Sequence, residues 1–460
     1  MKHFLSFPFL LTAISAFSQN EDSITISRIA DEVLIRGRAY ENLRELTKKI
    51  GARLTASPGF YKAEAWGQKA LQDAGADKVY LQECMVPHWV RGGKDEAKYF
   101  VGSDGKGKTL DVLALGNSLG TGAKGLAAPV ILINSFEELE QRKDEVKGKI
   151  VFYNYKFNPR FIHTFQSYSD AVRFRGQGAS RAARYGAVAV LVRSMTHATD
   201  NNPHTGAMNY NDSFPKIPAL AVGIQDADKL AEVIQNNKSN NAAVKLFLKS
   251  NAKMFSDTVG HNVIGELTGS EFPNQIITVG GHLDSWDPAE GAHDDGAGCV
   301  HSIEALRALK SIGYRPKRTI RVVLFANEEN GGRGGSKYAE EAKNKNEQHI
   351  LALESDEGGF TPRSFGFTMS KEKLEKVRTW LPLFSPYLVW QFNEGGGGAD
   401  IGPLARTLGT PIAGFQPDSQ RYFDIHHSRA DVFENVNKRE LELGALNIAA
   451  LIYLVDKYGL

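Results

Sequence analysis

The residues whose types and spacing could do chemistry begin in the segment 276–298, where a strand-like apolar run ends in polar side chains. His282 and Asp284 follow directly on two glycines, and Asp294 comes twelve residues after His282. An imidazole and carboxylates held on rigid backbone are ligands that a zinc-class ion prefers. Taken alone, the segment would suit a buried strand followed by a polar surface loop equally well. Whether the segment forms a metal site therefore depends on whether other segments supply further ligands.

Three further segments place carboxylates or imidazoles close behind an apolar run. They are residues 319–326 followed by Glu328 and Glu329, residues 349–353 followed by Asp356, and residues 422–431 with His426, His427 and Asp431. Ligands gather at the carboxyl ends of the strands in an open parallel sheet. We therefore expect side chains from all four segments to meet at one sheet edge and form a metal site. For any one carboxylate by itself, an exposed position without function is the plain alternative.

Seven short motifs, which include these segments, are shared with a known family of enzymes. They are IGARLTASPG (50–59), GGHLDSW (280–286), HDDGAG (293–298), NEENGGRGGS (327–336), ESDEGG (354–359), GGADIGPL (397–404) and HHSRAD (426–431). On these motifs the chain resembles the secreted co-catalytic di-zinc aminopeptidases and carboxypeptidases. The resemblance covers nearly all of the chain after residue 18, so it implies the fold as well as the site.

The resemblance implies two Zn²⁺ per chain, with the carboxylate of Asp294 bridging them. The other ligands would be His282 and Asp356 on one ion, and Glu329 and His427 on the second. The residues alone leave open which imidazole of the His426-His427 pair binds metal. The family pattern, a His followed by Ser or Thr, two further residues and Asp, selects His427. His426 stands where some relatives carry a tyrosine that stabilises the oxyanion, so it is a candidate for that role.

By the same resemblance, Glu328 is the general base. Peptide hydrolysis needs a polarised carbonyl, an activated water and a stabilised oxyanion, and a metal pair supplies the first two. Successive side chains of an extended segment alternate in direction, so Glu329 can bind metal while Glu328 moves the proton. Asp284, two residues after His282, is a candidate for fixing the imidazole tautomer. Asp431 is a similar candidate near the C-terminus.

The order of elements predicts an α/β fold, with a mostly parallel central sheet flanked by helices and a smaller α/β insert. We expect the catalytic domain at 19–117 and 256–460, and the insert at 118–255. Within the insert, the pattern predicts strands at 129–133, 149–153, 187–193 and 217–222, and helices at 136–143, 178–185 and 227–235. The segments VKGKIVFYN, GASRAARYGAVAVLVRS and IPALAVGIQDADKL resemble a protease-associated domain.

The first 18 residues have the charge and apolar run of a secretory signal, with cleavage near Ser18. Their apolar run is too short to cross a bilayer, and no cysteine there supports a lipid anchor. We therefore expect an exported, periplasmic or secreted, protein without a membrane anchor. Cys84 and Cys299 fit no metal-binding spacing, and we expect both to be small buried hydrophobic residues.

The composition is that of a globular enzyme. The formal net charge is +2, and acids and bases are mixed along the chain, which disfavours nucleic acid as a partner. The resemblance implies a peptide substrate, in particular dipeptides with free termini, and a homodimer. Two other functions stay open: a non-catalytic binding protein on a peptidase scaffold, and a glutaminyl-cyclase-like acyltransferase with one zinc.

Overall fold

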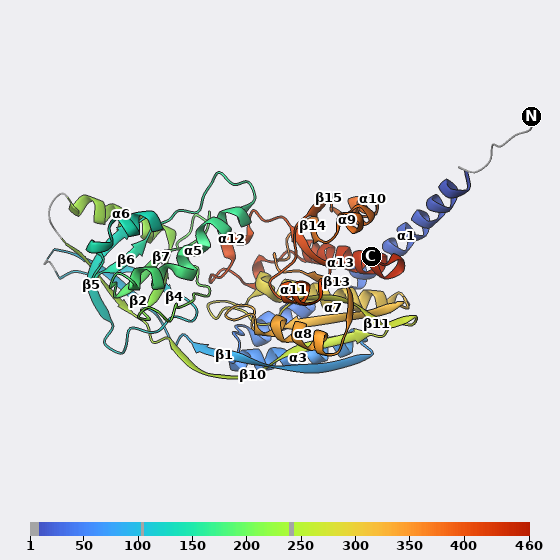
Figure 1. The fold of residues 1–460 in the computed structure, drawn as a ribbon, viewed down its shortest axis with the longest axis horizontal. Coiled ribbons are helices and arrows are strands. Elements are labelled where there is room, and N and C mark those ends of the chain that lie inside the picture. The colour runs from blue at the N-terminus through green and yellow to red at the C-terminus, as the bar shows by residue number, and fades with distance from the viewer. Residues whose placement is uncertain (1–8, 103–104, 239–242) are drawn as a thin grey trace, which may run out of the picture.

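The computed structural model describes residues 9–102, 105–238 and 243–460, with side chains from residue 21 onward. Two lobes lie side by side along the long axis of the molecule (Figure 1). The left-hand lobe contains the middle of the chain, and the right-hand lobe contains the N-terminal and C-terminal parts. Each lobe is built around one eight-stranded sheet.

The larger lobe is built on a mixed sheet whose centre is parallel. In spatial order its strands are β1 (Lys78–Val90), β10 (Lys253–Leu267), β12 (Arg318–Phe325), β11 (Phe272–His282), β13 (Gln348–Glu354), β16 (Ile412–Pro417), β14 (Pro362–Thr368) and β15 (Gln391–Glu394). The run β12-β11-β13-β16 is parallel, and antiparallel pairs flank it on both sides. The predicted fold class and its mostly parallel central sheet are confirmed.

The central strands are apolar on both faces because helices cover both faces. In β12, Ile320, Val322 and Leu324 join the core on one face, and the alternate residues Val323 and Phe325 join the core on the other. The first core also contains helices α1 (Phe9–Arg36), α3 (Pro58–Asp73), α7 (Ala297–Ser311) and α13 (Lys438–Tyr458). The second contains α8 (Arg333–Asn344) and α11 (Gly402–Leu408).

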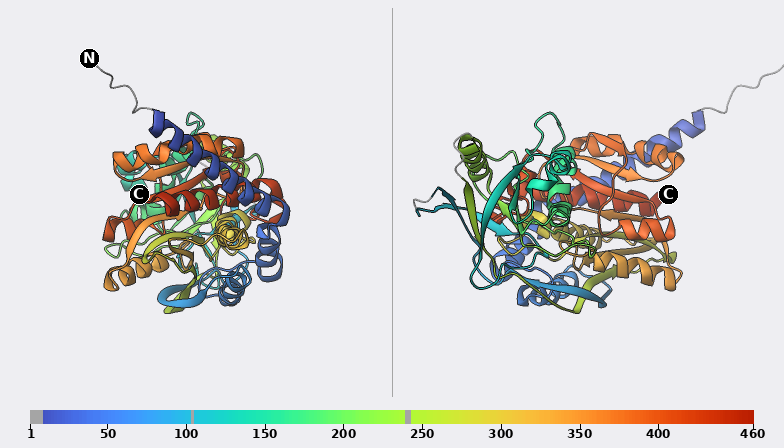
Figure 2. Two further views of the ribbon diagram at one scale, coloured as in Figure 1. Left: turned by 90° about the vertical axis from the view of Figure 1, so that its right-hand side faces the viewer. Right: turned by 60° about the vertical axis from the view of Figure 1, so that its left-hand side comes forward.

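Shorter helices complete this lobe. They are α2 (Ala39–Arg44), the π-helix η1 (Glu45–Ile50), α9 (Lys371–Arg378), α10 (Leu381–Phe384), the 3₁₀ turn η4 (Ser385–Tyr387) and the 3₁₀ turn η5 (Phe433–Asn435). Helix α12 (Tyr422–Ile425) also comes from the C-terminal part of the chain but packs in the core of the smaller lobe (Figure 1). Helix α1 runs beside α13 in both Figure 1 and Figure 2. Asp22 of α1 accepts hydrogen bonds from Tyr453, Lys457 and Tyr458 of α13, which fixes the two helices against each other.

The smaller lobe is a second sheet with helices on its two faces. Its strands, in spatial order, are β3 (Lys108–Leu110), β2 (Glu96–Val101), β9 (Val244–Lys249), β5 (Leu126–Ile133), β6 (Ile150–Tyr153), β7 (Ala189–Arg193), β8 (Ala219–Val222) and β4 (Val112–Ala114). Helices α4 (Phe136–Gln141) and α5 (Thr164–Ala183) pack in one core, and α6 (Ile224–Lys238) packs in the other. A 3₁₀ turn, η2 (Lys143–Glu145), follows α4.

Most predicted elements of the smaller lobe are present, but one helix is much longer than the sequence suggests. The pattern predicts a helix at 178–185, whereas α5 spans Thr164–Ala183. Its buried face includes Ser167, Ala171 and Phe174, a spacing that polar and glycine residues obscure in the sequence. Strands β2, β3 and β4 pair into the second sheet although they precede residue 118. The second sheet therefore includes strands from residues 19–117, a range that the sequence analysis assigns to the catalytic domain.

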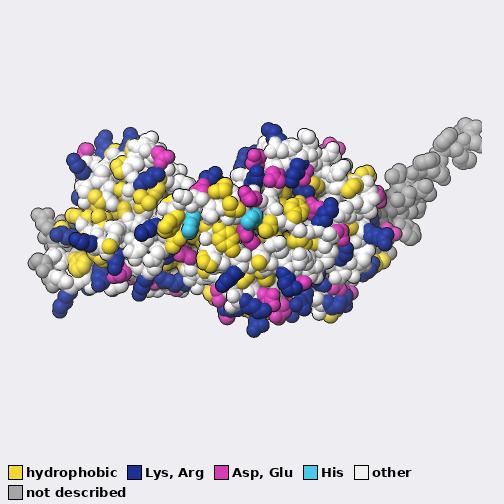
Figure 3. Space-filling view, turned by 90° about the horizontal axis from the view of Figure 1, so that it is seen from below, with side chains coloured by type: hydrophobic (Ala, Val, Ile, Leu, Met, Phe, Trp, Pro, Cys, Tyr) yellow, Lys and Arg dark blue, Asp and Glu magenta, His cyan; other side chains and the backbone are white. Residues whose placement is uncertain are grey.

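Cysteine usage agrees with expectation, because Cys84 and Cys299 are both free and buried. No helix within the described residues is long and apolar enough to cross a membrane. The predicted signal falls partly on residues 1–8, which lie outside the described residues. On the face seen in Figure 3, basic and acidic side chains are interspersed.

The fold depends on the packing of α13, which yields a direct prediction. Leu446 lies in α13 and is fully buried in the first core. We expect Leu446→Ala to lower the free energy of unfolding by about 2–5 kcal/mol, because it removes apolar contacts and leaves a cavity. The control, Leu81→Ala on β1, changes a side chain that is 37% exposed and should cost less than about 1 kcal/mol. If denaturant unfolding shows that both variants lose the same free energy of unfolding, this assignment of the core is contradicted.

Candidate metal centre

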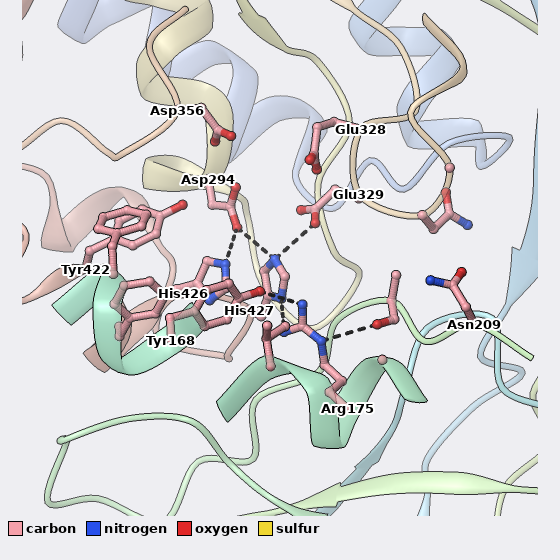
Figure 4. Close-up of a pocket in the computed structure, with 17 residues that line it drawn as sticks. Tyr168, Arg175, Asn209, Asp294, Glu328, Glu329, Asp356, Tyr422, His426 and His427 are labelled. Carbon is pink, nitrogen blue, oxygen red and sulfur yellow. Dashed lines mark hydrogen bonds and ion pairs between the residues drawn. The ribbon is translucent and has the colours of Figure 1, made fainter. Parts of the chain in front are cut away.

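Parallel strands bring the predicted metal ligands to one edge of the larger sheet. His282 is the last residue of β11, Glu329 follows β12, and Asp356 follows β13. Strand β11 pairs with the other two in parallel, so these three side chains leave the sheet at the same edge. His427 comes from the segment after α12, and Asp294 comes from η3 (Ala292–Gly296), a kinked segment that leads into α7 and in which Asp294 itself has non-helical φ and ψ. Figure 4 shows four of these side chains converging.

The carboxylate of Asp294 lies at the centre of the group. Its Oδ1 atom is 3.2 Å from Nε2 of His282, and its Oδ2 atom is 3.2 Å from Nε2 of His427. Asp356 completes the first side, with Oδ1 3.4 Å from the same nitrogen of His282. Glu329 completes the second side, with Oε2 3.1 Å from the same nitrogen of His427. Each Asp294 oxygen therefore belongs to a separate group of one imidazole and one further carboxylate.

The residues present fit a pair of zinc-class cations. All donors are imidazole nitrogens or carboxylate oxygens, as zinc prefers. Asp294 Oδ2 is buried and accepts no hydrogen bond within the described residues, so it is an unsatisfied acceptor. Burial, and then the negative charge of Asp294, raise the pKa of Glu329 well above its usual value. Several acidic groups buried so close together are costly unless positive charge compensates them, and a bound cation would supply more of it than the imidazoles can.

Glu328 lines the cavity beside these donors. This cavity has a volume of about 460 Å³ and is lined by residues of both lobes, among them Phe165 and Asn209 of the smaller lobe. In the chain without metal, burial raises the pKa of Glu328 to about 8, and the charges of Asp356 and Asp294 act in the same direction. A carboxylate with its pKa near neutrality is suited to taking up and returning a proton.

Asp284 and Asp431 lie close to the metal ligands, and the sequence did not predict their hydrogen-bond partners. Nδ1 of His282 lies 3.0 Å from the backbone carbonyl of Asp284 but 3.8 Å from its carboxylate. The Asp284 carboxylate instead accepts hydrogen bonds from the Thr55 hydroxyl and the Glu328 backbone N–H. The carbonyl, rather than the carboxylate, is thus the closer group for fixing the His282 tautomer.

Asp431 holds the backbone on which the central carboxylate stands. It accepts hydrogen bonds from the backbone N–H groups of His293, at 2.7 Å, and Asp294, at 3.1 Å. The carboxylate of Asp295, which follows Asp294 in the chain, accepts hydrogen bonds from the backbone N–H groups of His282 and Gly298. The Asp295 carboxylate therefore ties the end of β11 to the first turn of α7, and positions Asp294 between them.

His426 lies against His427 with the two rings stacked at a centroid distance of 3.5 Å. Its Nε2 atom is 3.6 Å from Asp294 Oδ2, which is farther than the 3.2 Å of His427. His426 also lines the cavity, and could reach a substrate oxygen there. Its role as oxyanion donor stays a prediction, because its distance to Asp294 is also compatible with metal binding.

The smaller lobe contributes contacts to His427 that the sequence did not predict. Nδ1 of His427 lies 3.3 Å from the backbone carbonyl of Thr205 and 3.4 Å from the guanidinium of Arg175. If Nε2 faces a metal, Nδ1 carries the proton and can donate it to the Thr205 carbonyl. Arg175 itself donates to the carbonyls of Thr205 and Ala207, and so holds that segment in place. These residues lie more than 200 positions before His427, and no local pattern marks them.

The motif IGARLTASPG contains an arginine, Arg53, that holds the loop between the first two metal ligands. Arg53 is fully buried and donates hydrogen bonds to the backbone carbonyls of Leu283, Glu290 and Gly291. One guanidinium thus fastens the loop between β11 and η3, which joins His282 to Asp294. The sequence showed the motif but not this function, since its partners lie about 230 residues away.

Comparison with known proteins shows which family the chain is similar to. Residues 262–452 match the model of Peptidase family M28. Carboxypeptidase Q of Homo sapiens is 36% identical over 423 residues, which cover 92% of this chain and 85% of that protein. Carboxypeptidase Q of Xenopus laevis is 37% identical over 425 residues, covering 92% and 87%. Aminopeptidase YwaD of Bacillus subtilis (strain 168) is 24% identical over 466 residues, covering 96% and 90%.

Solved structures share the fold. A peptidase M28 precursor from Shewanella amazonensis superposes with a TM-score of 0.88 at 30% identity, over 95% of this chain and 97% of that one. A zinc aminopeptidase from Bacillus subtilis superposes with a TM-score of 0.64 at 21% identity, over 92% and 95%.

The fold, together with a buried group of imidazole and carboxylate donors at the ends of parallel strands, defines a metallopeptidase. The chain belongs to peptidase family M28. The motifs quoted above also resemble those of carboxypeptidase Q, in agreement with the identities. The prediction of a zinc-dependent metallo-exopeptidase is confirmed.

The contact between Arg175 and the segment that orients His427 gives a testable prediction. We expect Arg175→Ala to lower kcat/KM and zinc affinity by roughly 10- to 100-fold, the usual effect of removing a group that orients a metal ligand. Arg181→Ala serves as control, because Arg181 is an exposed residue of the same helix, α5. Zinc titration and dipeptide kinetics measure both quantities. Indistinguishable behaviour of the two variants would show that Arg175 does not support the centre.

Proposed function

We propose that the chain is an exported di-zinc exopeptidase that hydrolyses dipeptides or short peptides. One observation carries this proposal: the two oxygens of Asp294 face two separate groups of donors, with Glu328 beside them over a cavity. A carboxylate in that position can bridge two ions, as in two-metal hydrolases, where the ions lie roughly 3.5–4 Å apart. We therefore assign His282, Asp294 and Asp356 to one ion, and Asp294, Glu329 and His427 to the other.

The residues of this chain supply the proton transfers. When bound, the zinc pair would polarise the scissile carbonyl and lower the pKa of a water, so that this water can lose a proton and attack the carbonyl. Glu328 takes the proton from that water and delivers it to the amine that leaves. His426, which lines the same cavity, would donate a hydrogen bond to the oxygen that becomes negative.

The cavity supports a small substrate. Its volume of about 460 Å³ is enclosed partly by aromatic residues of the smaller lobe and of α12, including Phe165, Tyr168 and Tyr422. A pocket of this size accommodates a dipeptide or the end of a short peptide better than the middle of an extended chain.

Two other functions were open from the sequence, and the site disfavours both. A binding protein on a peptidase scaffold has no need for a complete set of metal donors, whereas all five ligand positions and Glu328 converge here. A one-zinc acyltransferase has no need for Asp356 beside His282. Export through the segment 1–18, the homodimer, and the smaller lobe as a protease-associated insert remain proposals that rest on resemblance.

Replacing the proposed base separates chemistry from metal binding. We expect Glu328→Gln to lower kcat on a neutral dipeptide by about 10²- to 10⁴-fold, because the amide cannot accept the proton. Zinc content should match that of wild type, since Glu328 is not one of the proposed ligands. Glu340→Gln, an exposed acid on α8, is the matched control. Retained activity in Glu328→Gln would refute its role as base.

Metal removal tests the cofactor. Dialysis against a zinc chelator should abolish hydrolysis, and stoichiometric zinc should restore it, because the proposed mechanism needs bound metal to polarise the carbonyl and activate the water. The restored activity should rise until about two zinc ions per chain are bound. Full activity in the chelated protein would contradict a metal mechanism, and saturation at one ion would favour the one-zinc alternative.

A further inference from the structure

A second cavity adjoins the catalytic one and has acidic walls. Its volume is about 620 Å³, and we call it the side pocket, defined by Phe165, Glu357, Arg363, Trp390, Glu394 and Asp418 among its lining residues. Phe165 also lines the catalytic cavity. Asp356, a proposed metal ligand, lines the catalytic cavity, and its chain neighbour Glu357 lines the side pocket. The two cavities therefore share a wall.

The carboxylates of the side pocket outnumber its cations. Asp418 forms an ion pair with Arg363 at 3.0 Å. Among the described residues, the side chains of Glu357 and Glu394 have no ion-pair or hydrogen-bond partner. These two acids come from different elements, the segment after β13 and the end of β15. The pocket thus presents two carboxyl groups that have no cationic partner among the described residues, and a cation entering it would gain from both.

An exposed aromatic ring accompanies these acids. Trp390, just before β15, lines the side pocket and is 53% exposed, so part of its indole ring is open to a ligand. An indole face attracts a cation, and the methylene groups of a long basic side chain can pack on it. Carboxylates beside an exposed indole are thus complementary to a lysine or arginine side chain.

The backbone beside Glu394 is held rather than free. The N–H of Gly395 donates to the carbonyl of Phe367 at 2.8 Å, and the hydroxyl of Thr368 donates to the carbonyl of Gly396 at 2.7 Å. A side chain on Gly396, which has a φ of +140°, would clash with the backbone of Gly366. The glycine-rich loop therefore packs closely on β14 and fixes the position of the acid before it, as a preformed binding pocket requires.

We propose that the side pocket is a specificity subsite for a basic side chain of the substrate, lysine or arginine. This inference rests on the proposed peptidase function. A free α-amino group of the peptide could supply the same positive charge. The volume of about 620 Å³ far exceeds the need of an amino group and suits a long side chain, so we assign the pocket to the side chain.

The test compares dipeptides that differ only in side-chain charge. Lys-Ala and Ala-Lys are measured against norleucine-Ala and Ala-norleucine, which have the same termini and a neutral side chain of similar length. We expect the wild type to favour one lysine peptide over its norleucine counterpart in kcat/KM by about tenfold or more, as one charged contact allows. Glu357→Gln and Glu394→Gln should each lower this ratio several-fold, whereas Glu340→Gln should leave it unchanged.

The ratio isolates the subsite from effects on the metal centre. A general disturbance by Glu357→Gln beside Asp356 would lower both rates equally, and Glu394→Gln on β15 checks the result from a second element. Charge reversal by Glu394→Lys should shift the preference toward peptides with glutamate. Equal rates for lysine and norleucine peptides in the wild type would overturn the inference, as would an equal fall for both in both glutamine variants, which would point to the α-amino group. Absence of any dipeptide hydrolysis in the wild type would instead refute the proposed function itself.

Discussion

One buried carboxylate, that of Asp294, is the constraint on which the rest of this structure depends. An unpaired charge in a protein interior is costly, so the chain must surround it with positive partners on both sides. Burial acts to raise the pKa of Asp294, but the imidazoles of His282 and His427, each 3.2 Å from one of its oxygens, hold it well below its usual value. The carboxylate is therefore ionised and can share its two oxygens between two cations.

Much of the larger lobe keeps that carboxylate in place. Strand β11 and helix α7 are joined through Asp295, and the loop between them is fastened by Arg53 from the N-terminal region. Asp431 adds two hydrogen bonds from the C-terminal side. The positions of the metal donors are thus set by contacts among distant parts of the chain, at the ends of the parallel central strands of a mixed sheet.

The smaller lobe is part of the same centre. Its carbonyl at Thr205 and its guanidinium at Arg175 lie against His427, and its Phe165 and Tyr168 pack on Tyr422 and Phe423 of α12. These contacts join the two lobes where the catalytic cavity lies (Figure 4). A movement of the smaller lobe would consequently change both the shape of the cavity and the orientation of a metal ligand.

The sequence predicted what depends on short patterns and missed what depends on distant contacts. Strands β11, β12 and β13 were predictable because apolar runs end in glycines or acids, and the donors follow directly on them. Arg175 and Thr205 could not be predicted as supports of His427, because no spacing in the chain signals a contact over more than 200 residues. The membership of β2 and β4 in the second sheet depends on pairing with β9 and β8, which lie more than 100 residues later, and β3 joins the sheet through β2.

The central claim is that Asp294 bridges two ions, and anomalous X-ray diffraction at the zinc edge tests it most directly. Crystals of the zinc-loaded protein should give two anomalous peaks, one facing Asp294 Oδ1 on the side of His282 and one facing Oδ2 on the side of His427. Their separation should be about 3.5–4 Å. A single peak at full zinc loading, or two peaks that do not flank Asp294, would contradict the account.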